Sequence, residues 1–209
     1  MAERERLRRR LDDGLAALDL DLSGAVRDRL IAYVELLARW NAAYNLTAVR
    51  DPGEMVARHL LDSLAIAPHV SGATLADLGS GAGLPGIPLA LIAAERQVTL
   101  VDSNGKKARF LREAVRALKL ANVRVIEGRV QDVPGQFDCV TARAFATLAD
   151  MLNWAGGLLA DGGTWLAMKG KVDEAEIAAV PAGFRVERIV ALQVPATVGE
   201  RHLIVVRKA

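Results

Sequence analysis

The chain has 209 residues, 52% of them hydrophobic, and its 27 Lys and Arg against 25 Asp and Glu leave a net charge of only +2. This length holds one α/β domain with a short appendage and excludes two full domains, and a polyanionic partner must be met by a local basic patch. Apolar stretches fall far short of the ~20 residues of a bilayer span, and no cleavable signal segment follows the start, so we expect a soluble, cytoplasmic protein with no membrane partner.

Residues 1–70 carry helical signals and no strand signals. Apolar positions over 26–44 recur with the helical period, and Ser23 is placed to cap this helix. A second helix is expected from Asp51, a capping residue, to near Pro68. Residues 1–70 should therefore form a helical extension that packs on the main domain.

From residue 73 onward, short apolar runs alternate with helical segments. The expected strands are 73–78, 97–102, 123–127, 137–142 and 163–168, and the expected helices are 86–94, 104–119 and 147–159. Such alternation with short connections predicts a parallel, doubly wound sheet. Two further extended runs, 184–194 and 201–207, are separated by too few residues for a crossover helix, so they should pair as an antiparallel hairpin.

The predicted fold is therefore α/β, with a mostly parallel seven-stranded sheet and a C-terminal antiparallel hairpin over residues 71–209, preceded by the helical extension over 1–70. An antiparallel strand at the end of such a sheet distinguishes Rossmann-like S-adenosylmethionine-dependent methyltransferases from dinucleotide dehydrogenases. The hairpin thus favours the methyltransferase fold.

The first expected strand of this domain runs into the glycine-rich segment Asp77–Gly86. A strand that breaks into alternating glycines and continues as a helix brings bare backbone N–H groups against a ligand. Residues 81–86 also satisfy the G-x-G-x-x-G dinucleotide pattern, which is weak on its own. Asp77 favours S-adenosylmethionine, because a carboxylate suits a ligand with an ammonium and a sulfonium better than one with a pyrophosphate. The alternative for Asp77 is a turn or helix cap.

The next expected strand ends at Asp102, about 20 residues past the loop, where an acidic side chain accepts hydrogen bonds from ribose hydroxyls. Both NAD and S-adenosylmethionine contain such a ribose. An NAD(P)-dependent oxidoreductase and a cofactor-binding regulator without activity therefore stay as alternatives. The expected hairpin and the lack of a Tyr-Lys or His-acid hydride site oppose the oxidoreductase.

Several segments in order resemble one known family. They are Asn45–Ala48, Arg58–Leu64, Gly79–Ala90, Asp102–Lys107, Ala142–Phe145 and Met168–Gly170. They resemble the 16S ribosomal RNA guanine-N7 methyltransferases of the small subunit, the glucose-inhibited division protein B family. The resemblance implies a bacterial cytoplasmic enzyme that uses S-adenosylmethionine to methylate a guanine in the 530 loop of 16S rRNA, as free RNA or in the small ribosomal subunit. Methylation of a small molecule or a protein is the alternative.

The resemblance also implies cofactor contacts. They fall on Gly79, Leu84, Val130, Gln131 and Arg143, to which the loop and ribose arguments add Asp77, Gly81 and Asp102. Gly79 would let the backbone close on the methionine part, Leu84 would pack in the pocket wall, and Val130 would meet the adenine. Gln131 occupies a position where an acidic residue is common in the family. For this residue we therefore expect a cofactor contact through the backbone and not through the side chain. The alternative for Arg143 is a surface residue at the sheet edge.

Guanine N7 has a lone pair and no proton, so methyl transfer to it needs positioning and no general base. This agrees with the absence of a Ser-His-Asp or Cys-His constellation, and we predict no catalytic acid or base. Lys106, at a helix start, and Lys169, at the end of the fifth strand, are candidates for RNA contacts, with ordinary surface lysines as the alternative.

Three other residue types are expected to be structural. Cys139 lies in a buried-strand pattern, and the histidines have no metal-ligand spacing, so no metal site is predicted. His59 should make a structural hydrogen bond. Trp154 and Trp165 are expected in the core.

Overall fold

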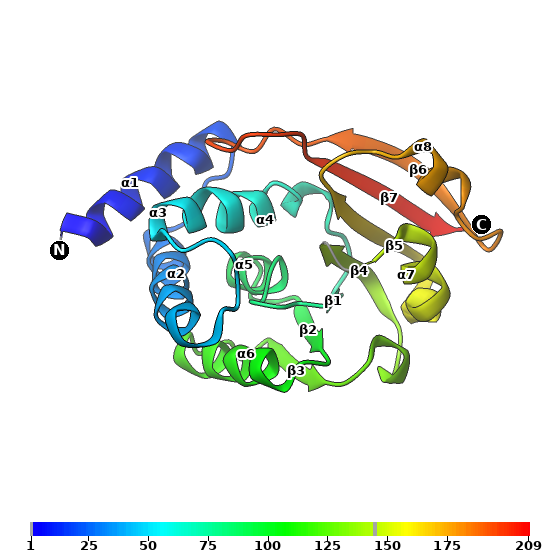
Figure 1. The fold of residues 1–209 in the computed structure, drawn as a ribbon, viewed down its shortest axis with the longest axis horizontal. Helices are drawn as coiled ribbons and strands as arrows, with labels where there is room; N and C mark the ends of the chain where they lie inside the picture. Colours follow the sequence, from blue (N-terminus) through cyan, green and yellow to red (C-terminus); the bar gives the residue numbers. More distant parts are fainter. Residues whose placement is uncertain (1, 144–145) are drawn as a thin grey trace.

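The computed structural model describes residues 2–143 and 146–209, so the Ala144–Phe145 part of one motif lies outside the described residues. Within them, seven strands form one sheet in the order β3-β2-β1-β4-β5-β7-β6 (Figure 1). The strands are β1 Thr74–Leu78, β2 Gln97–Asp102, β3 Val123–Glu127, β4 Phe137–Arg143, β5 Leu159–Lys169, β6 Phe184–Ala191 and β7 His202–Lys208. β1 to β5 are parallel, and β7 pairs antiparallel with both β5 and β6. The predicted fold class is confirmed.

The helical elements follow the sequence signals closely. They are α1 Ala2–Ala17, α2 Gly24–Tyr44, α3 Pro52–Met55, the π-helix Val56–Leu61, α4 Asp62–Leu64, α5 Gly86–Ile92, α6 Gly105–Ala117, α7 Leu148–Ala155 and α8 Glu174–Ala178, with short 3₁₀ turns at Ala67–His69, Val130–Asp132 and Gly156–Leu158. Both predicted caps are present: the Ser23 hydroxyl accepts from the Val26 amide, and Asp51 accepts from the Glu54 amide.

Four elements differ from the sequence-based expectation. The helix expected up to 159 ends near the glycine pair at 156–157, and β5 begins at Leu159 instead of 163. Glycine is a poor helix former, so the helix ends there. The short α8 is not predicted, and the helix after Asp51 contains a π-helical turn over Val56–Leu61, a rare form that often marks functional sites.

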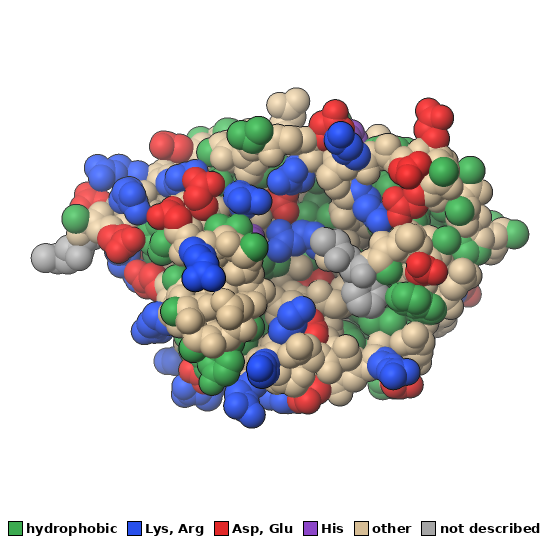
Figure 2. Space-filling view, viewed as in Figure 1, with side chains coloured by type: hydrophobic (Ala, Val, Ile, Leu, Met, Phe, Trp, Pro, Cys, Tyr) green, Lys and Arg blue, Asp and Glu red, His purple; other side chains and the backbone are tan. Residues whose placement is uncertain are grey.

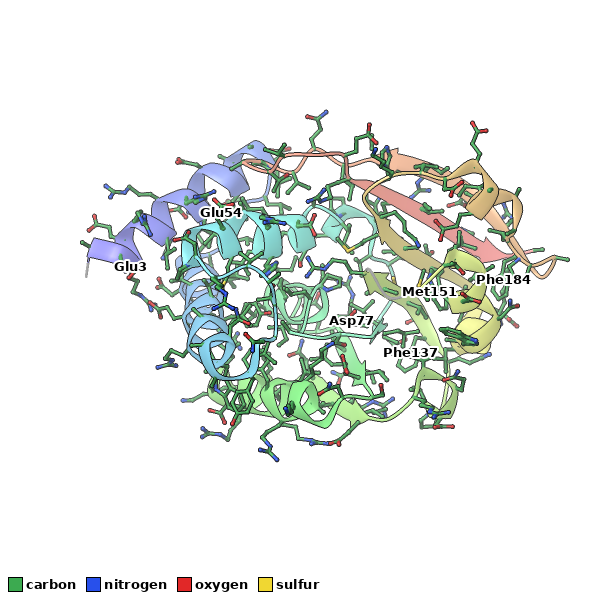
Figure 3. The ribbon with its side chains drawn as sticks, viewed as in Figure 1. Glu3, Glu54, Asp77, Phe137, Met151 and Phe184 are labelled. Carbon is green, nitrogen blue, oxygen red and sulfur yellow. The ribbon has the colours of Figure 1, made fainter. Side chains whose placement is uncertain are left out.

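The two faces of the sheet are covered by different helices. One apolar core joins the N-terminal helices to α5, α6 and strand residues such as Leu75, while the other packs α7 against residues such as Trp165. Met151 and Phe184 lie on the α7 side (Figure 3). The N-terminal helices thus share a core with the sheet, and a domain boundary near residue 70 stays a prediction.

The core residues fit most of the expectations. Trp165 and Cys139 are fully buried, and burial raises the pKa of the Cys139 thiol to about 12, which keeps it an inert thiol. Trp154 is 44% exposed, so its placement in the core is wrong. The buried face of α7 consists of Leu148, Met151, Leu152 and Ala155, and Trp154 lies off that face.

The sheet order reverses between β1 and β4. β1 pairs with β2 on one side and with β4 on the other, and Leu78 is level with Val101 and Ala142. Asp102 and Arg143, the next residues of β2 and β4, therefore lie at the same edge as the glycine loop. Open α/β sheets bind ligands at this switch point, beyond the carboxyl ends of the strands.

Candidate active site

The glycine loop connects β1 to α5 through backbone conformations that favour glycine. Gly81 has φ +58°, and a Cβ there would meet nothing nearer than the Gly79 carbonyl oxygen at 3.8 Å. A Cβ on Gly86 would lie 2.3 Å from Leu100 Cδ2, so that glycine lets the start of α5 pack on β2. The loop is therefore packed on one side and open at Gly81.

Asp77 is completely buried at the end of β1, near the middle of the molecule (Figure 3). Its Oδ2 accepts from the Gly86 amide at 3.0 Å, which confirms the capping role. Its Oδ1 has no hydrogen-bond partner among the described residues. Burial raises the pKa of Asp77 to about 7, against the Gly86 amide and the Arg143 guanidinium, which lower it. A buried acceptor without a donor fits a ligand that brings an ammonium group.

Asp102 ties the loop to the end of β2. Its Oδ2 accepts from the Gly81 amide at 2.8 Å and its Oδ1 from the Asn104 amide at 2.9 Å. Lys107 Nζ lies 4.0 Å from Oδ2. Each carboxylate oxygen has a second lone pair, so Asp102 can hold the loop and still accept from a ribose hydroxyl. Sequence reasoning predicted a ribose contact for Asp102, which stays a prediction, and missed the loop contact.

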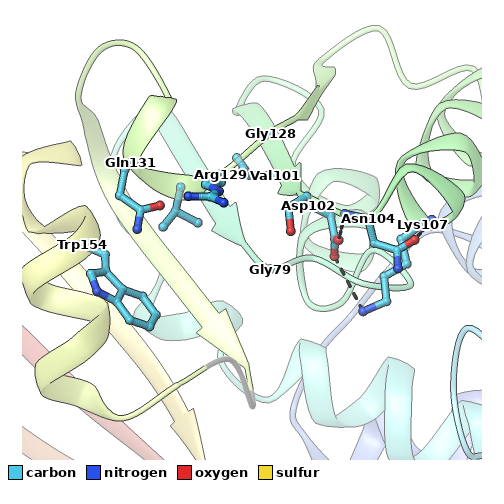
Figure 4. Close-up of a pocket in the computed structure, with 11 residues that line it drawn as sticks. Gly79, Val101, Asp102, Asn104, Lys107, Gly128, Arg129, Gln131 and Trp154 are labelled. Carbon is cyan, nitrogen blue, oxygen red and sulfur yellow. Dashed lines mark hydrogen bonds and ion pairs between the residues drawn. The ribbon is translucent and has the colours of Figure 1, made fainter.

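A cavity of 580 Å³, the cofactor pocket, opens beside this loop (Figure 4). Its lining is Gly79, Val101, Asp102, Ser103, Asn104, Lys107, Gly128, Arg129, Val130, Gln131 and Trp154. Four predicted cofactor residues are thus brought together: Gly79, Asp102, Val130 and Gln131. The Trp154 ring forms the wall opposite Asp102 (Figure 4). Only its position off the buried face of α7 could have indicated this from the sequence.

The other four predicted cofactor residues lie outside this lining: Asp77, Gly81, Leu84 and Arg143. Gly81 adjoins the pocket through its bond to Asp102, and Leu84 is buried at 3% exposure within the loop. Arg143 lines a neighbouring hollow, yet its charge lowers the pKa values of both Asp77 and His59. Arg143 therefore lines that hollow and is near enough to the glycine loop for its charge to act on Asp77.

The neighbouring hollow, here the basic pocket, has a volume of 380 Å³. It is lined by Thr47, Ala48, Val49, Arg58, His59, Asp62, Arg143, Met168, Lys169, Gly170, Leu192, Arg201 and His202. Four of these side chains are basic and one is acidic. Lys and Arg side chains are visible inside and around the central hollow of this face (Figure 2). The pocket thus combines apolar walls with an excess of positive charge.

His59 is held on both ring nitrogens. Its Nδ1 donates to the Arg58 carbonyl and its Nε2 accepts from the Thr47 hydroxyl, both at 2.9 Å, with the tautomer assigned from this network. The same hydroxyl accepts from the Val49 amide. Burial, with the charge of Arg143, lowers the pKa of His59 to about 4. The expected structural role of His59 is confirmed, and the neutral ring has no free nitrogen for acid–base chemistry.

The two candidate RNA lysines have different surroundings. Lys169 borders the basic pocket, but its ammonium contacts Glu176 Oε1 at 2.6 Å and the Ala146 carbonyl at 2.9 Å. Lys106 is exposed at the start of α6 and lines neither pocket. Its amide donates to Asn104, the helix cap.

Two kinds of feature are missing from the described ranges 2–143 and 146–209. No group of three or more His, Cys, Asp or Glu side chains in them could hold a metal ion. None of the helices there has both the length and the apolar character needed to cross a bilayer.

The sheet order, the C-terminal hairpin, the glycine loop and the acidic end of β2 define a Rossmann-like methyltransferase that uses S-adenosylmethionine. Solved structures share this fold. Mitomycin 7-O-methyltransferase MmcR aligns with TM-score 0.61 at 17% identity, over 75% of this chain and 56% of that longer chain. TYW2 of P. horikoshii, solved in complex with MeSAdo, aligns with TM-score 0.54 at 16% identity, over 70% and 61%.

Sequence comparison identifies the family. A model of the family described as rRNA small subunit methyltransferase G matches residues 27–204, and the chain belongs to that family. The enzyme of that name from Xanthomonas euvesicatoria pv. vesicatoria is 58% identical over 95% of this chain and 93% of its own. That of Stenotrophomonas maltophilia strain K279a is 56% identical over 94% and 92%. The resemblance inferred from the motifs is confirmed, and the oxidoreductase alternative is wrong.

Proposed function

We propose that this protein transfers the methyl group of S-adenosylmethionine to N7 of a guanine in the 530 loop of 16S rRNA, in free RNA or in the small ribosomal subunit, in the cytoplasm. The observation that carries the proposal is the basic pocket beside the glycine loop, at the carboxyl ends of β4 and β5. It offers space next to the cofactor pocket and positive charge for an RNA backbone. The family membership supports the same substrate.

The proposed cofactor orientation follows the two ends of its pocket. Asp102 would accept from the ribose hydroxyls, and Val130 with the Gln131 backbone would bound the adenine. The methionine part would lie toward Gly79, where the unpartnered Asp77 oxygen can accept from an ammonium group. Bound there, the cofactor would supply an electrophilic methyl group for transfer.

The acceptor nitrogen explains why a base is unnecessary. The N7 lone pair forms the new bond to the methyl carbon as the carbon–sulfur bond breaks, and no proton leaves the guanine. The residues of the basic pocket need only hold the base in line, an effect worth up to roughly 7 to 11 kcal/mol. The locked, neutral His59 is compatible with this chemistry.

RNA binding is proposed to depend on local charge. The net charge is only +2, yet Arg58, Arg143, Lys169 and Arg201 all line the basic pocket, and Lys107 and Arg129 line its neighbour. Cations gathered on one face attract a polyanion more strongly than net charge indicates. Lys106 and Lys169 stay predictions as RNA contacts.

The experiment uses small ribosomal subunits from cells that lack the protein. Labelled methyl groups should enter 16S rRNA, and mass mapping should place them on a guanine of the 530 loop. Substituting 7-deazaguanosine at that position removes the N7 lone pair and should abolish methylation while subunit binding persists. Methylation of the deaza substrate would indicate another acceptor atom. Incorporation only into proteins or small metabolites would support the alternative substrates.

A further inference from the structure

The basic pocket contains a carboxylate shared by two arginines. The Asp62 side chain is 6% exposed, and its Oδ2 accepts from Arg143 Nη1 at 3.0 Å while its Oδ1 accepts from Arg201 Nε at 3.2 Å. Asp62 comes from α4, Arg143 from the end of β4, and Arg201 from the residue before β7. One acidic side chain thus joins three segments that are remote in the sequence.

Stability alone is a weak reason for such a cluster. A buried ion pair roughly breaks even with apolar residues of similar volume, because both charges must be removed from water. Here two cations share a single anion, so one positive charge is left over. Both guanidinium groups line the basic pocket, and the side chains of Arg143 and Arg201 are 23% and 26% exposed. The surplus charge is therefore available to a ligand.

Both arginines also have N–H donors that make no hydrogen bond within the described chain. A guanidinium has five N–H donors. Arg143 uses Nη1 toward Asp62 and the Arg58 carbonyl, while Arg201 uses Nε toward Asp62 and Nη1 toward the Glu200 carbonyl. The Nη2 groups of both arginines make no hydrogen bond within the described chain. Planar guanidinium forks match the oxygen spacing of a phosphate.

We propose that Asp62 is a positioning residue, which holds Arg143 and Arg201 side by side as a binding site for one phosphodiester group of the RNA substrate. Two guanidinium groups repel one another, and the carboxylate between them offsets that repulsion and fixes both side chains. This role rests on the proposed function, because the phosphate belongs to the nucleotide chain that carries the target base. Arg201 is a residue that the sequence motifs do not single out.

The decisive measurement is the affinity of Asp62→Asn for unmethylated small ribosomal subunits at several salt concentrations. A carboxylate that contributed only charge would oppose RNA binding, so its neutralisation would tighten binding. If Asp62 positions the two arginines, the substitution has the opposite effect. The affinity of Asp62→Asn for the subunits falls about tenfold or more, and the slope of log affinity against log salt becomes flatter by about one. Calorimetric affinity for S-adenosylhomocysteine, which binds in the other pocket, should change little.

The matched control is Asp132→Asn. Asp132 is an exposed acid near the same edge of the sheet, in the Val130–Asp132 turn, and its side chain holds no arginine. Its neutralisation should leave RNA affinity unchanged or slightly higher. Asp62→Glu, which keeps both carboxylate oxygens, should restore part of the affinity lost in Asp62→Asn.

Arg201→Gln provides a second route, because this side chain is more exposed than Asp62 and its loss leaves the core intact. It should weaken subunit binding like Asp62→Asn, and the double variant should be no weaker than either single variant. Should Asp62→Asn fail to fold, Arg201→Gln decides, and unchanged affinity overturns the proposal. If the unaltered protein neither binds nor methylates subunits, the proposed function itself fails. If it does both while Asp62→Asn binds as tightly or more tightly, only the positioning role is overturned.

Discussion

Replacing Asp77 by Asn should make the protein more stable at neutral pH and worse at binding its cofactor. Burial raises the pKa of this carboxyl from 3.8 to about 7. Between these values the unfolded chain loses the proton while the folded protein keeps it, so the stabilising contribution is complete below pH 3.8 and is lost as pH rises through about 7. As pH rises through this range, the free energy of unfolding falls by about 4 kcal/mol in total. The isosteric amide does not titrate, so it avoids this loss.

Urea unfolding without cofactor, followed by circular dichroism, measures the effect. From about pH 5 to pH 8, the free energy of unfolding of Asp77→Asn should rise relative to the unaltered protein by about 3 kcal/mol. Asp138→Asn is the control, because the pKa of Asp138 is shifted in the opposite direction from that of Asp77. Hydrogen bonds from Thr74 lower the pKa of Asp138. Its contribution is present above the unfolded value and is lost only at acid pH, so that variant should be destabilised equally across this range.

Two results would refute this reasoning about Asp77. Parallel stability curves for Asp77→Asn and the unaltered protein would show that the carboxyl ionises as easily in the folded state. An unchanged calorimetric affinity for S-adenosylhomocysteine would show that the unpartnered Oδ1 does not meet the ligand.

Three further predictions concern the two pockets. Asp102→Asn should weaken S-adenosylhomocysteine binding by roughly 1.5 to 3 kcal/mol, because charge-assisted hydrogen bonds to the loop and the ribose are lost; equal affinity by calorimetry would remove Asp102 from the site. The single-turnover methylation rate should be flat between roughly pH 6 and 8, and His59→Ala should lower it without changing that profile, since the His59 ring is already neutral there. An acidic limb that vanishes in this variant would contradict a base-free mechanism. Cofactor binding should change the fluorescence of the unaltered protein more than that of Trp154→Phe, because the indole forms a pocket wall; identical changes would place Trp154 away from the ligand.

Local sequence signals determined the fold and much of the cofactor pocket. Ser23 and Asp51 cap their helices through neighbours three residues away, and the period of apolar residues depends only on the element that carries them. The glycine loop and Asp102 could be placed at one sheet edge, because all strands of a parallel sheet end on the same side. The motifs were sufficient to recognise the family.

Tertiary packing alone decided the basic pocket. Asp62 meets Arg143 and Arg201, which follow it by 81 and 139 residues, and no local pattern indicates which remote charges will become neighbours. The same holds for Trp154, since a step of one residue along α7 separates this pocket wall from the buried Ala155. The sequence determines which groups can ionise or donate, whereas burial and the approach of distant segments determine their pKa values and partners. That is why Asp77 was recognised as a loop residue from the sequence, whereas its raised pKa and its unpartnered oxygen follow only from the folded chain.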